Sequence, residues 1–168
     1  MKNQINKKSL LCYALCYLTV FALLILGFSL FFSVSGKELE IAEQPNSLGR
    51  AIQIIGNNLL NYTGYLLTFL LYPLYIFLDL TLNAWSISVS LKAQGAGETF
   101  RHLILHGILE LPNSILYTFL SFGAFRKLCR EKDFGIRAYI RYVADRRVFY
   151  ILSLLLVIAA GLTEGLLS

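Results

Sequence analysis

The chain has 168 residues, of which 57% are hydrophobic and only 15% are charged, and its formal net charge is +5. A soluble domain carries about 25% charged residues, and the apolar residues here gather in runs of the roughly 20 needed to cross a bilayer as a helix. The composition therefore excludes an ordinary soluble enzyme or nucleic-acid-binding domain. Because the runs lack the alternation of barrel strands, we predict an all-α integral membrane protein, a polytopic bundle of about five transmembrane helices.

The first apolar run covers residues 9–34 and follows three lysines, Lys2, Lys7 and Lys8. A basic start before an apolar core is also the pattern of a signal peptide, but the apolar core of such a peptide has only about 7–15 residues. The length of this run predicts an uncleaved first span, followed by a polar loop over residues 36–50.

The second apolar stretch, residues 52–92, is too long for a single span and has Pro73 near its middle. Proline removes a helical hydrogen bond and clashes with the preceding turn. We therefore predict two spans, 52–72 and 74–92. One span plus a re-entrant segment is the alternative that the pattern leaves open.

A glycine-rich break at 94–97 separates these spans from the next run, 100–123, and the last run covers 148–167. The segment between them, 124–147, carries eight of the fifteen basic residues, and three more lie at the N-terminus. Positively charged segments stay in the cytoplasm, and four crossings place both of them there. We thus expect the N-terminus inside and the C-terminus outside.

The basic segment also has a helical pattern. Ile136, Tyr139, Ile140 and Val143 recur at helical spacing, with arginines on another face. This is typical of an amphipathic helix on an anionic membrane surface, and equally of a docking surface for a cytoplasmic partner such as an ATPase. A plain charged connector is the third interpretation. The basic residues that we assign to this surface are Arg137, Arg141, Arg146 and Arg147.

Three cysteines, Cys12, Cys16 and Cys129, fit no metal-binding or disulfide spacing. Cys12 and Cys16 lie one helical turn apart at the start of the first span. We expect them to pack as small apolar side chains, with acylation as the minor alternative.

Several polar side chains fall within or beside the apolar runs. A charged group at membrane depth costs about 2.5 kcal/mol or more on insertion scales, so its presence indicates a specific role. The intramembrane candidates outside the heptapeptide discussed next are Asn57, Asn58, Asp79, Asn83 and Glu164.

The most unusual stretch is His-Gly-Ile-Leu-Glu-Leu-Pro, residues 106–112. His106 and Glu110 are four residues apart and share a helix face. Gly107 is expected to permit close backbone approach, and Pro112 to weaken the helix beside the polar pair.

Three interpretations of this pair compete. In the first, the two side chains tie helices together, and in the second they line a path for a proton, ion or substrate. In the third, they form a metal or catalytic site with His102, although the His-Glu-x-x-His order of zinc proteases is missing. We expect no metal and no cofactor.

The heptapeptide resembles the signature of the stage II sporulation protein M family, whose members carry His-Gly-x-x-Glu-Leu-Pro at the start of a span. Asn57-Asn58 resembles the paired asparagines of the family's second span, and Asn83-Ala84-Trp85-Ser86-Ile87 stands where members have Asn-Gly. Ala159-Ala160-Gly161-Leu162-Thr163-Glu164 resembles its closing span. The chain departs from the pattern at Asn113, where alanine is usual, and at Tyr117 and Phe119, where smaller residues are usual.

The resemblance implies a polytopic protein of a bacterial cytoplasmic membrane that has no catalytic activity and anchors partner proteins. We therefore expect a non-enzymatic scaffold that contacts the lipid bilayer and membrane or cytoplasmic proteins, and no nucleic acid. A membrane subunit of a transport or export system is the second hypothesis, which a continuous polar cavity would favour. An intramembrane hydrolase is the third.

Overall fold

The computed structural model describes residues 5–32 and 48–167, except for the side chains of residues 102, 105, 106 and 167. Every regular element in this part of the chain is a helix, which confirms the all-α prediction. The helices are α1 (Lys7–Phe31), α2 (Leu48–Leu67), the short 3-10 helix η1 (Phe69–Leu71), α3 (Tyr72–Glu131), α4 (Ile136–Asp145) and α5 (Arg147–Leu167).

Four helical segments of the described chain are long and apolar enough to cross a membrane. They are Lys7–Phe31, Phe69–Arg101, Gly107–Glu131 and Arg147–Leu166. α2 is long enough but less apolar, because amides such as Asn57, Asn58 and Asn61 interrupt it. The chain thus has the helices of a multi-pass membrane protein.

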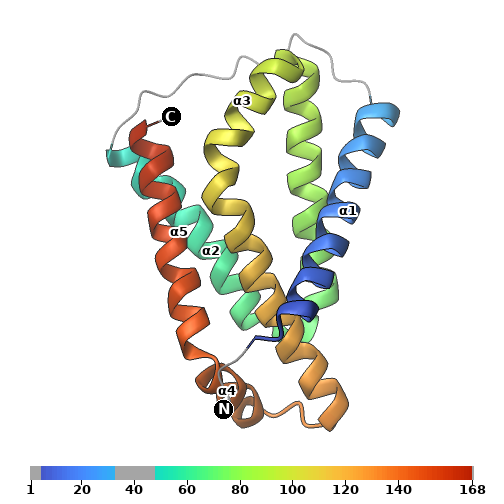
Figure 1. Cartoon of the computed structure of the whole chain (residues 1–168), viewed down its shortest axis with the longest axis vertical. Helices are drawn as coiled ribbons and strands as arrows, with labels where there is room; N and C mark the ends of the chain where they lie inside the picture. Colours follow the sequence, from blue (N-terminus) through green and yellow to red (C-terminus); the bar gives the residue numbers. More distant parts are fainter. Residues whose placement is uncertain (1–4, 33–47, 168) are drawn as a thin grey trace.

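The helix α3 consists of two antiparallel arms that meet at Gly95 (Figure 1). Gly95 has φ 82° and ψ 167°, a conformation that only glycine adopts readily. The second arm continues through Pro112 without a non-helical residue. Pro112 therefore does not interrupt the helix, and the break lies seventeen residues earlier, within the predicted glycine-rich segment.

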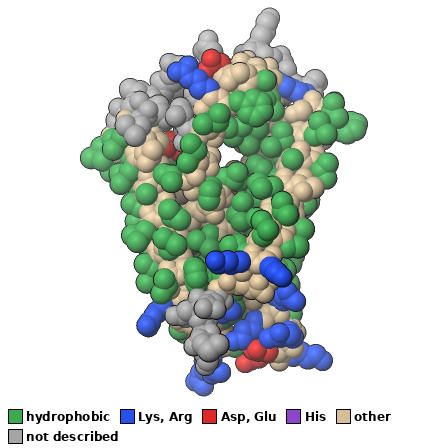
Figure 2. Space-filling model, in the orientation of Figure 1, with side chains coloured by type: hydrophobic (Ala, Val, Ile, Leu, Met, Phe, Trp, Pro, Cys, Tyr) green, Lys and Arg blue, Asp and Glu red, His purple; other side chains and the backbone are tan. Residues whose placement is uncertain are grey.

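The long helices run along the longest axis of the molecule, and successive segments reverse direction (Figure 1). The start of α1 and the helix α4 lie at the same end. Figure 2 shows blue Lys and Arg side chains gathered there, whereas the middle of the visible face is largely green. The two basic segments of the sequence are therefore on one side of an apolar zone.

α2 and α5 form a close antiparallel pair. Gly161 lies against Ile55, and Gly165 lies against Ala51, one turn farther along each helix. At the other end of the pair, the Tyr62 hydroxyl donates a 2.8 Å hydrogen bond to the Tyr150 carbonyl oxygen. Small residues let the backbones approach, as is typical of helix contacts in membranes.

The core between the helices is rich in tyrosine. Tyr65 is 1% exposed, and Leu120 and Leu128 are fully buried. Near the basic end, the Phe69 ring of η1 stacks on Tyr139 of α4 at a centroid distance of 3.9 Å, and the Tyr139 hydroxyl donates to the Leu66 carbonyl oxygen. These contacts hold α4 against the turn between α2 and α3.

The four apolar residues that share a predicted face of α4 are not all packed against the bundle. Tyr139 is buried, but Ile136 and Ile140 are exposed, and Ala138 and Tyr142 are buried instead. The helix packs against the bundle through its tyrosines, because the Tyr139 hydroxyl and ring find partners in Leu66 and Phe69 and Tyr142 is buried. Its two isoleucines join the arginines on the outer face.

α1 packs against both arms of α3. At one end, the Tyr13 hydroxyl lies 2.6 Å from the Tyr72 hydroxyl. At the other, Trp85 makes edge-to-face contacts with Phe28 and Phe32 at centroid distances of 5.4 and 5.1 Å. Only one α1 residue, Tyr17, is buried, so most of this helix faces outward.

The free cysteines are exposed, Cys12 and Cys16 on α1 and Cys129 near the end of α3. The expectation that Cys12 and Cys16 are packed inside the protein is therefore wrong. They lie on the outer, largely apolar surface of α1.

Candidate functional site

A cavity of about 470 Å³ lies inside the bundle, between α1, α2, both arms of α3 and α5. α2 and the two arms of α3 contribute most of the polar side chains of its wall, whereas α1 and α5 contribute mainly apolar ones. Figure 2 shows the surface hollowed between the arms of α3, near the end where they join. The polar residues that line the cavity are Asn58, Asn61, Asp79, Asn83, Ser86, Glu110, Asn113, Ser114 and Tyr117.

Asp79, on the first arm of α3, is at the centre of a hydrogen-bond network. Its carboxylate accepts hydrogen bonds from the Tyr65 hydroxyl at 2.8 Å, the Asn83 amide at 2.9 Å and the Asn61 amide at 3.2 Å. Three donors on two helices thus surround one carboxylate. Such donors fix the orientation of the carboxylate.

Asn61 extends this network across the cavity. Its amide also donates to the Tyr117 hydroxyl at 3.2 Å, and its carbonyl oxygen accepts from Tyr75 at the same distance. The Tyr117 hydroxyl reaches Ser114 one turn earlier on the second arm. The network therefore connects α2 to both arms of α3.

The second carboxylate, Glu110, accepts a hydrogen bond from the Asn58 amide. Farther in, Asn113 is 2% exposed, and its side-chain oxygen accepts a 2.6 Å hydrogen bond from the fully buried Ser153 of α5. Asn58 and Asn61 lie one turn apart on α2, so the same helix face reaches both carboxylates. The cavity wall thus carries two acids and several amides and hydroxyls, and no lysine or arginine is among its described residues.

The structure brings together five of the predicted residues and separates others from them. Asn58, Asp79, Asn83, Gly107 and Glu110 line the cavity. The remaining intramembrane candidates lie elsewhere: Asn57 and Pro112 are exposed, and Glu164 is on α5, outside the lining. The predicted partner of Glu110, His106, belongs to the second arm of α3, but its side chain is outside the described residues, as is that of His102.

Gly107 does not have the predicted role of close helix contact. A Cβ added at this position would meet no atom within 4 Å. The close contacts are made instead by Gly161 and Gly165, against α2. Gly107 borders the cavity, where the absence of a side chain leaves open space.

Sequence analysis missed Asn61, Tyr65 and Tyr117, which carry much of the network. Asn58, Asn61 and Tyr65 follow one another at spacings of three and four residues, a polar stripe along an otherwise apolar helix. Glu110, Ser114 and Tyr117 repeat this pattern on α3. The sequence contains this periodicity. Tyr117, where the chain departs from the pattern of the family that it resembles, lies in the cavity wall.

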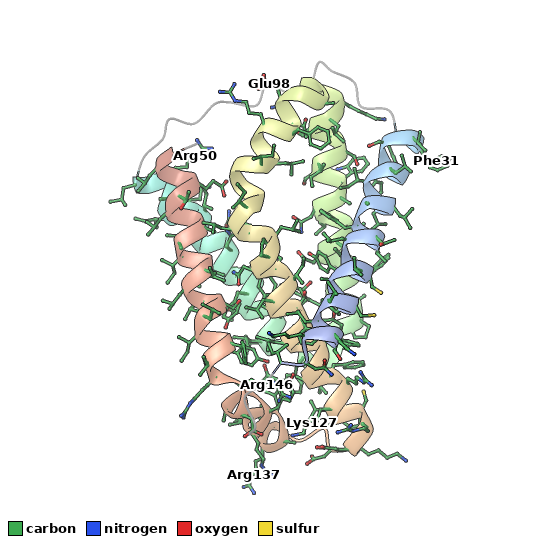
Figure 3. The ribbon with its side chains drawn as sticks, in the orientation of Figure 1. Phe31, Arg50, Glu98, Lys127, Arg137 and Arg146 are labelled. Carbon is green, nitrogen blue, oxygen red and sulfur yellow. The ribbon has the colours of Figure 1, made fainter. Side chains whose placement is uncertain are left out.

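The four predicted basic residues lie around α4. Arg137, Arg141 and Arg147 are exposed, and Figure 3 shows Arg137 projecting from the end of the molecule. Arg146 instead lies over the Tyr142 ring, with its guanidinium carbon 4.0 Å from the ring centroid. Burial raises the pKa of Tyr142 to about 12, so its hydroxyl stays neutral under this cation.

No group of three His, Cys, Asp or Glu side chains in the described part of the chain is arranged to hold a metal ion. The cavity wall provides acceptor oxygens together with hydrogen-bonded amides and hydroxyls. Such a lining can bind a cation, a proton or a solute rich in hydrogen-bond donors. Comparison of the chain with family models, curated proteins and solved structures finds no match.

Proposed function

We propose that the chain is a non-enzymatic membrane subunit of a transport system, and that its cavity binds a small solute with positive charge or hydrogen-bond donors. The observation that carries this proposal is the gathering of Asp79 and Glu110, from the two arms of α3, in one polar cavity. A scaffold that only packs helices together gains little from such an arrangement, since interhelical hydrogen bonds average about 0.6 kcal/mol.

The energetics support a role in binding. Two carboxylates at membrane depth cost about 5 kcal/mol together on insertion scales. Acidic residues at such positions face bundle interiors or water-filled cavities and mark ion and substrate paths. Asp79 and Glu110 lie in the apolar segments Phe69–Arg101 and Gly107–Glu131, so they meet this description.

The proposal includes a topology of five crossings in a bacterial cytoplasmic membrane. α2 would cross beside α5, which would shield the amide side chains of α2 from lipid. The two arms of α3 would each cross the membrane separately. The end that carries α4 and the start of α1 would face the cytoplasm, in agreement with the positive-inside rule. Membership of the stage II sporulation protein M family is likewise a proposal, supported by the heptapeptide at 106–112.

Water access to the cavity can be tested with single cysteines. In a variant without Cys12, Cys16 and Cys129, we expect Ser114→Cys, on the cavity wall, to react with a charged methanethiosulfonate reagent. Ile108→Cys, 66% exposed on the outside of the same arm, is the matched control and should be unreactive because lipid surrounds it.

Transport itself can be tested with the purified chain in proteoliposomes. We expect the wild type to take up protons, monovalent cations or small amines from a defined panel, and Asp79→Asn to abolish this uptake. Equal uptake by wild type, Asp79→Asn and empty vesicles, together with an unreactive Ser114→Cys, would contradict the proposal.

A partner-holding scaffold is the second candidate, supported by the outer face of α4. Ile136, Arg137, Ile140 and Arg141 are exposed side by side, which is a suitable surface for a cytoplasmic protein. Photocrosslinking from Ile140 in intact membranes should then capture a reproducible protein, and Arg137→Glu should prevent the capture. Crosslinks to lipid alone would count against this candidate.

A further inference from the structure

A second pocket, of about 770 Å³, opens at the basic end of the bundle between α1, the end of α3 and α4. It is separate from the polar cavity and shares no lining residue with it. Its charged side chains come from two places in the sequence. Arg126, Lys127 and Arg130 lie on the last turns of α3, and Arg146 lies at the junction of α4 and α5.

The charges of this pocket are unbalanced. Its described lining contains four cations and no carboxylate. Arg130 lies 4.0 Å from Glu131, outside the lining, but no ion pair of Arg126, Lys127 or Arg146 is found among the described residues. Arg146 and Lys127 both approach the Tyr142 ring, at 4.0 and 6.0 Å, so two like charges converge on one side chain.

The rest of the pocket is apolar and aromatic. Tyr13, Tyr72 and Phe122 are part of one aromatic cluster, with Tyr13 stacked on Phe122 at a centroid distance of 5.5 Å. Cys12 and Phe119 continue the wall toward the middle of the span Lys7–Phe31. The pocket therefore has a cationic part at the end of the bundle and an apolar part that continues along the outer surface of α1.

We propose that this pocket binds one anionic glycerophospholipid. Its phosphate would contact Arg126, Lys127 and Arg146, and an acyl chain would lie along Cys12 and Phe119. Clustered cations between helices at the cytoplasmic side are suited to lipid head groups, and arginine is well suited to phosphate oxygens. A free phosphate would satisfy the cations but would leave the apolar part of the pocket empty.

The test uses the full chain in a neutral detergent and measures lipid binding by native mass spectrometry and by thermal unfolding. Phosphatidylglycerol should bind and raise the Tm, and phosphatidylcholine should do neither. The double substitution Arg126→Gln with Lys127→Gln should weaken phosphatidylglycerol binding about tenfold or more, because each basic residue contributes to attraction of an anionic lipid.

The matched control is Arg137→Gln with Arg141→Gln, which removes the same charge from α4 outside the pocket and should change the affinity less than about threefold. Equal losses in the two double variants would overturn the proposal, since the attraction would then be general. Competition by glycerol 3-phosphate as effective as that by the lipid would also overturn it, in favour of a soluble phosphate.

The cysteines provide a test on the wild-type chain that does not depend on the folding of any variant. Bound lipid should slow the reaction of Cys12 and Cys16, which line the pocket, with N-ethylmaleimide. Cys129 is exposed and outside the lining, and its rate should stay unchanged. Protection of all three thiols, or of none, would refute a lipid seated in this pocket.

Discussion

The close contact between α2 and α5 makes Gly165 the position where one added methyl group has the largest expected effect. A Cβ at this position would lie 2.5 Å from the Ala51 Cβ and closer still to the Ala51 backbone. A rotamer change cannot relieve this contact, because backbone atoms form the obstacle. In Gly165→Ala the two helices must therefore move apart along the part of the interface that includes Gly161 and Ile55.

The cost can be worked from the packing that is lost. A gap of 0.5–1 Å forfeits about a quarter to a half of each van der Waals contact that it opens, and overpacked sites typically lose about 1–3 kcal/mol. Alanine returns up to about 1 kcal/mol through its better helix propensity. We therefore expect Gly165→Ala to lower the free energy of unfolding by about 1–2 kcal/mol.

Reversible unfolding in mixed micelles with increasing SDS, followed by circular dichroism, measures this difference. Gly56→Ala is the control, because it lies on α2 and a Cβ there meets no atom within 4 Å. We expect it to be neutral or stabilising by up to about 1 kcal/mol. Equal stability of Gly165→Ala and Gly56→Ala would refute the reasoning and show that the helices separate at no cost.

Three further predictions follow from hydrogen bonds between and within the helices, each measured in the same unfolding assay. Tyr62→Phe should lose about 1 kcal/mol, because it removes the hydroxyl that donates to the Tyr150 carbonyl oxygen; no loss would show that this bond adds nothing. Asn113→Ala should lose about 1–3 kcal/mol, since it removes the acceptor of the buried Ser153 hydroxyl, and restored stability in the double alanine variant would confirm the cause. Asp79→Asn should unfold like the wild type, whereas Asp79→Leu should lower the free energy of unfolding by about 2 kcal/mol or more, because the three donors lose their acceptor. Equal losses in the two variants would show that the negative charge of Asp79, and not its role as an acceptor, stabilises the fold.

Local composition was enough to predict the helices. The apolar runs predicted at 9–34 and 148–167 lie close to α1 and α5, because about 20 apolar residues have few other stable conformations in lipid. The turn near Pro73 was also indicated, and Pro73 occupies the first turn of α3, where a proline is tolerated. The two basic segments lie at the same end because the helical segments between them reverse direction and return the chain to that end (Figure 1).

The cavity could be predicted only in part. Asp79 and Glu110 stand out because charge is rare in apolar runs, but their convergence depends on how the arms of α3 pack. Asn61 was not among the predicted residues, although it bonds to Asp79 and Tyr117. Single-sequence reasoning weighs a residue by its neighbours in the chain, whereas the role of Asn61 comes from residues 18 and 56 positions away.

The local sequence around Pro112 and Ile140 did not predict how these residues lie in the structure. Proline lacks an amide hydrogen, yet bundles tolerate it within a helix when surrounding groups accommodate the local loss, and α3 continues through it. The spacing of α4 placed Ile140 on one face with Tyr139, but Ile140 is 58% exposed whereas Tyr139 is buried. Periodicity predicts which residues share a face, and packing against tyrosines decided which face turned inward.

The position of Trp85 also has a practical consequence. It is the only tryptophan among 23 aromatic residues of the types Phe, Trp and Tyr, and its indole contacts Phe28 and Phe32 near the end of α1 that lies away from the basic residues. The intrinsic fluorescence of the chain therefore reports on a single place, the attachment of α1 to the first arm of α3. A shift in emission wavelength would register detachment of α1 there without any added label.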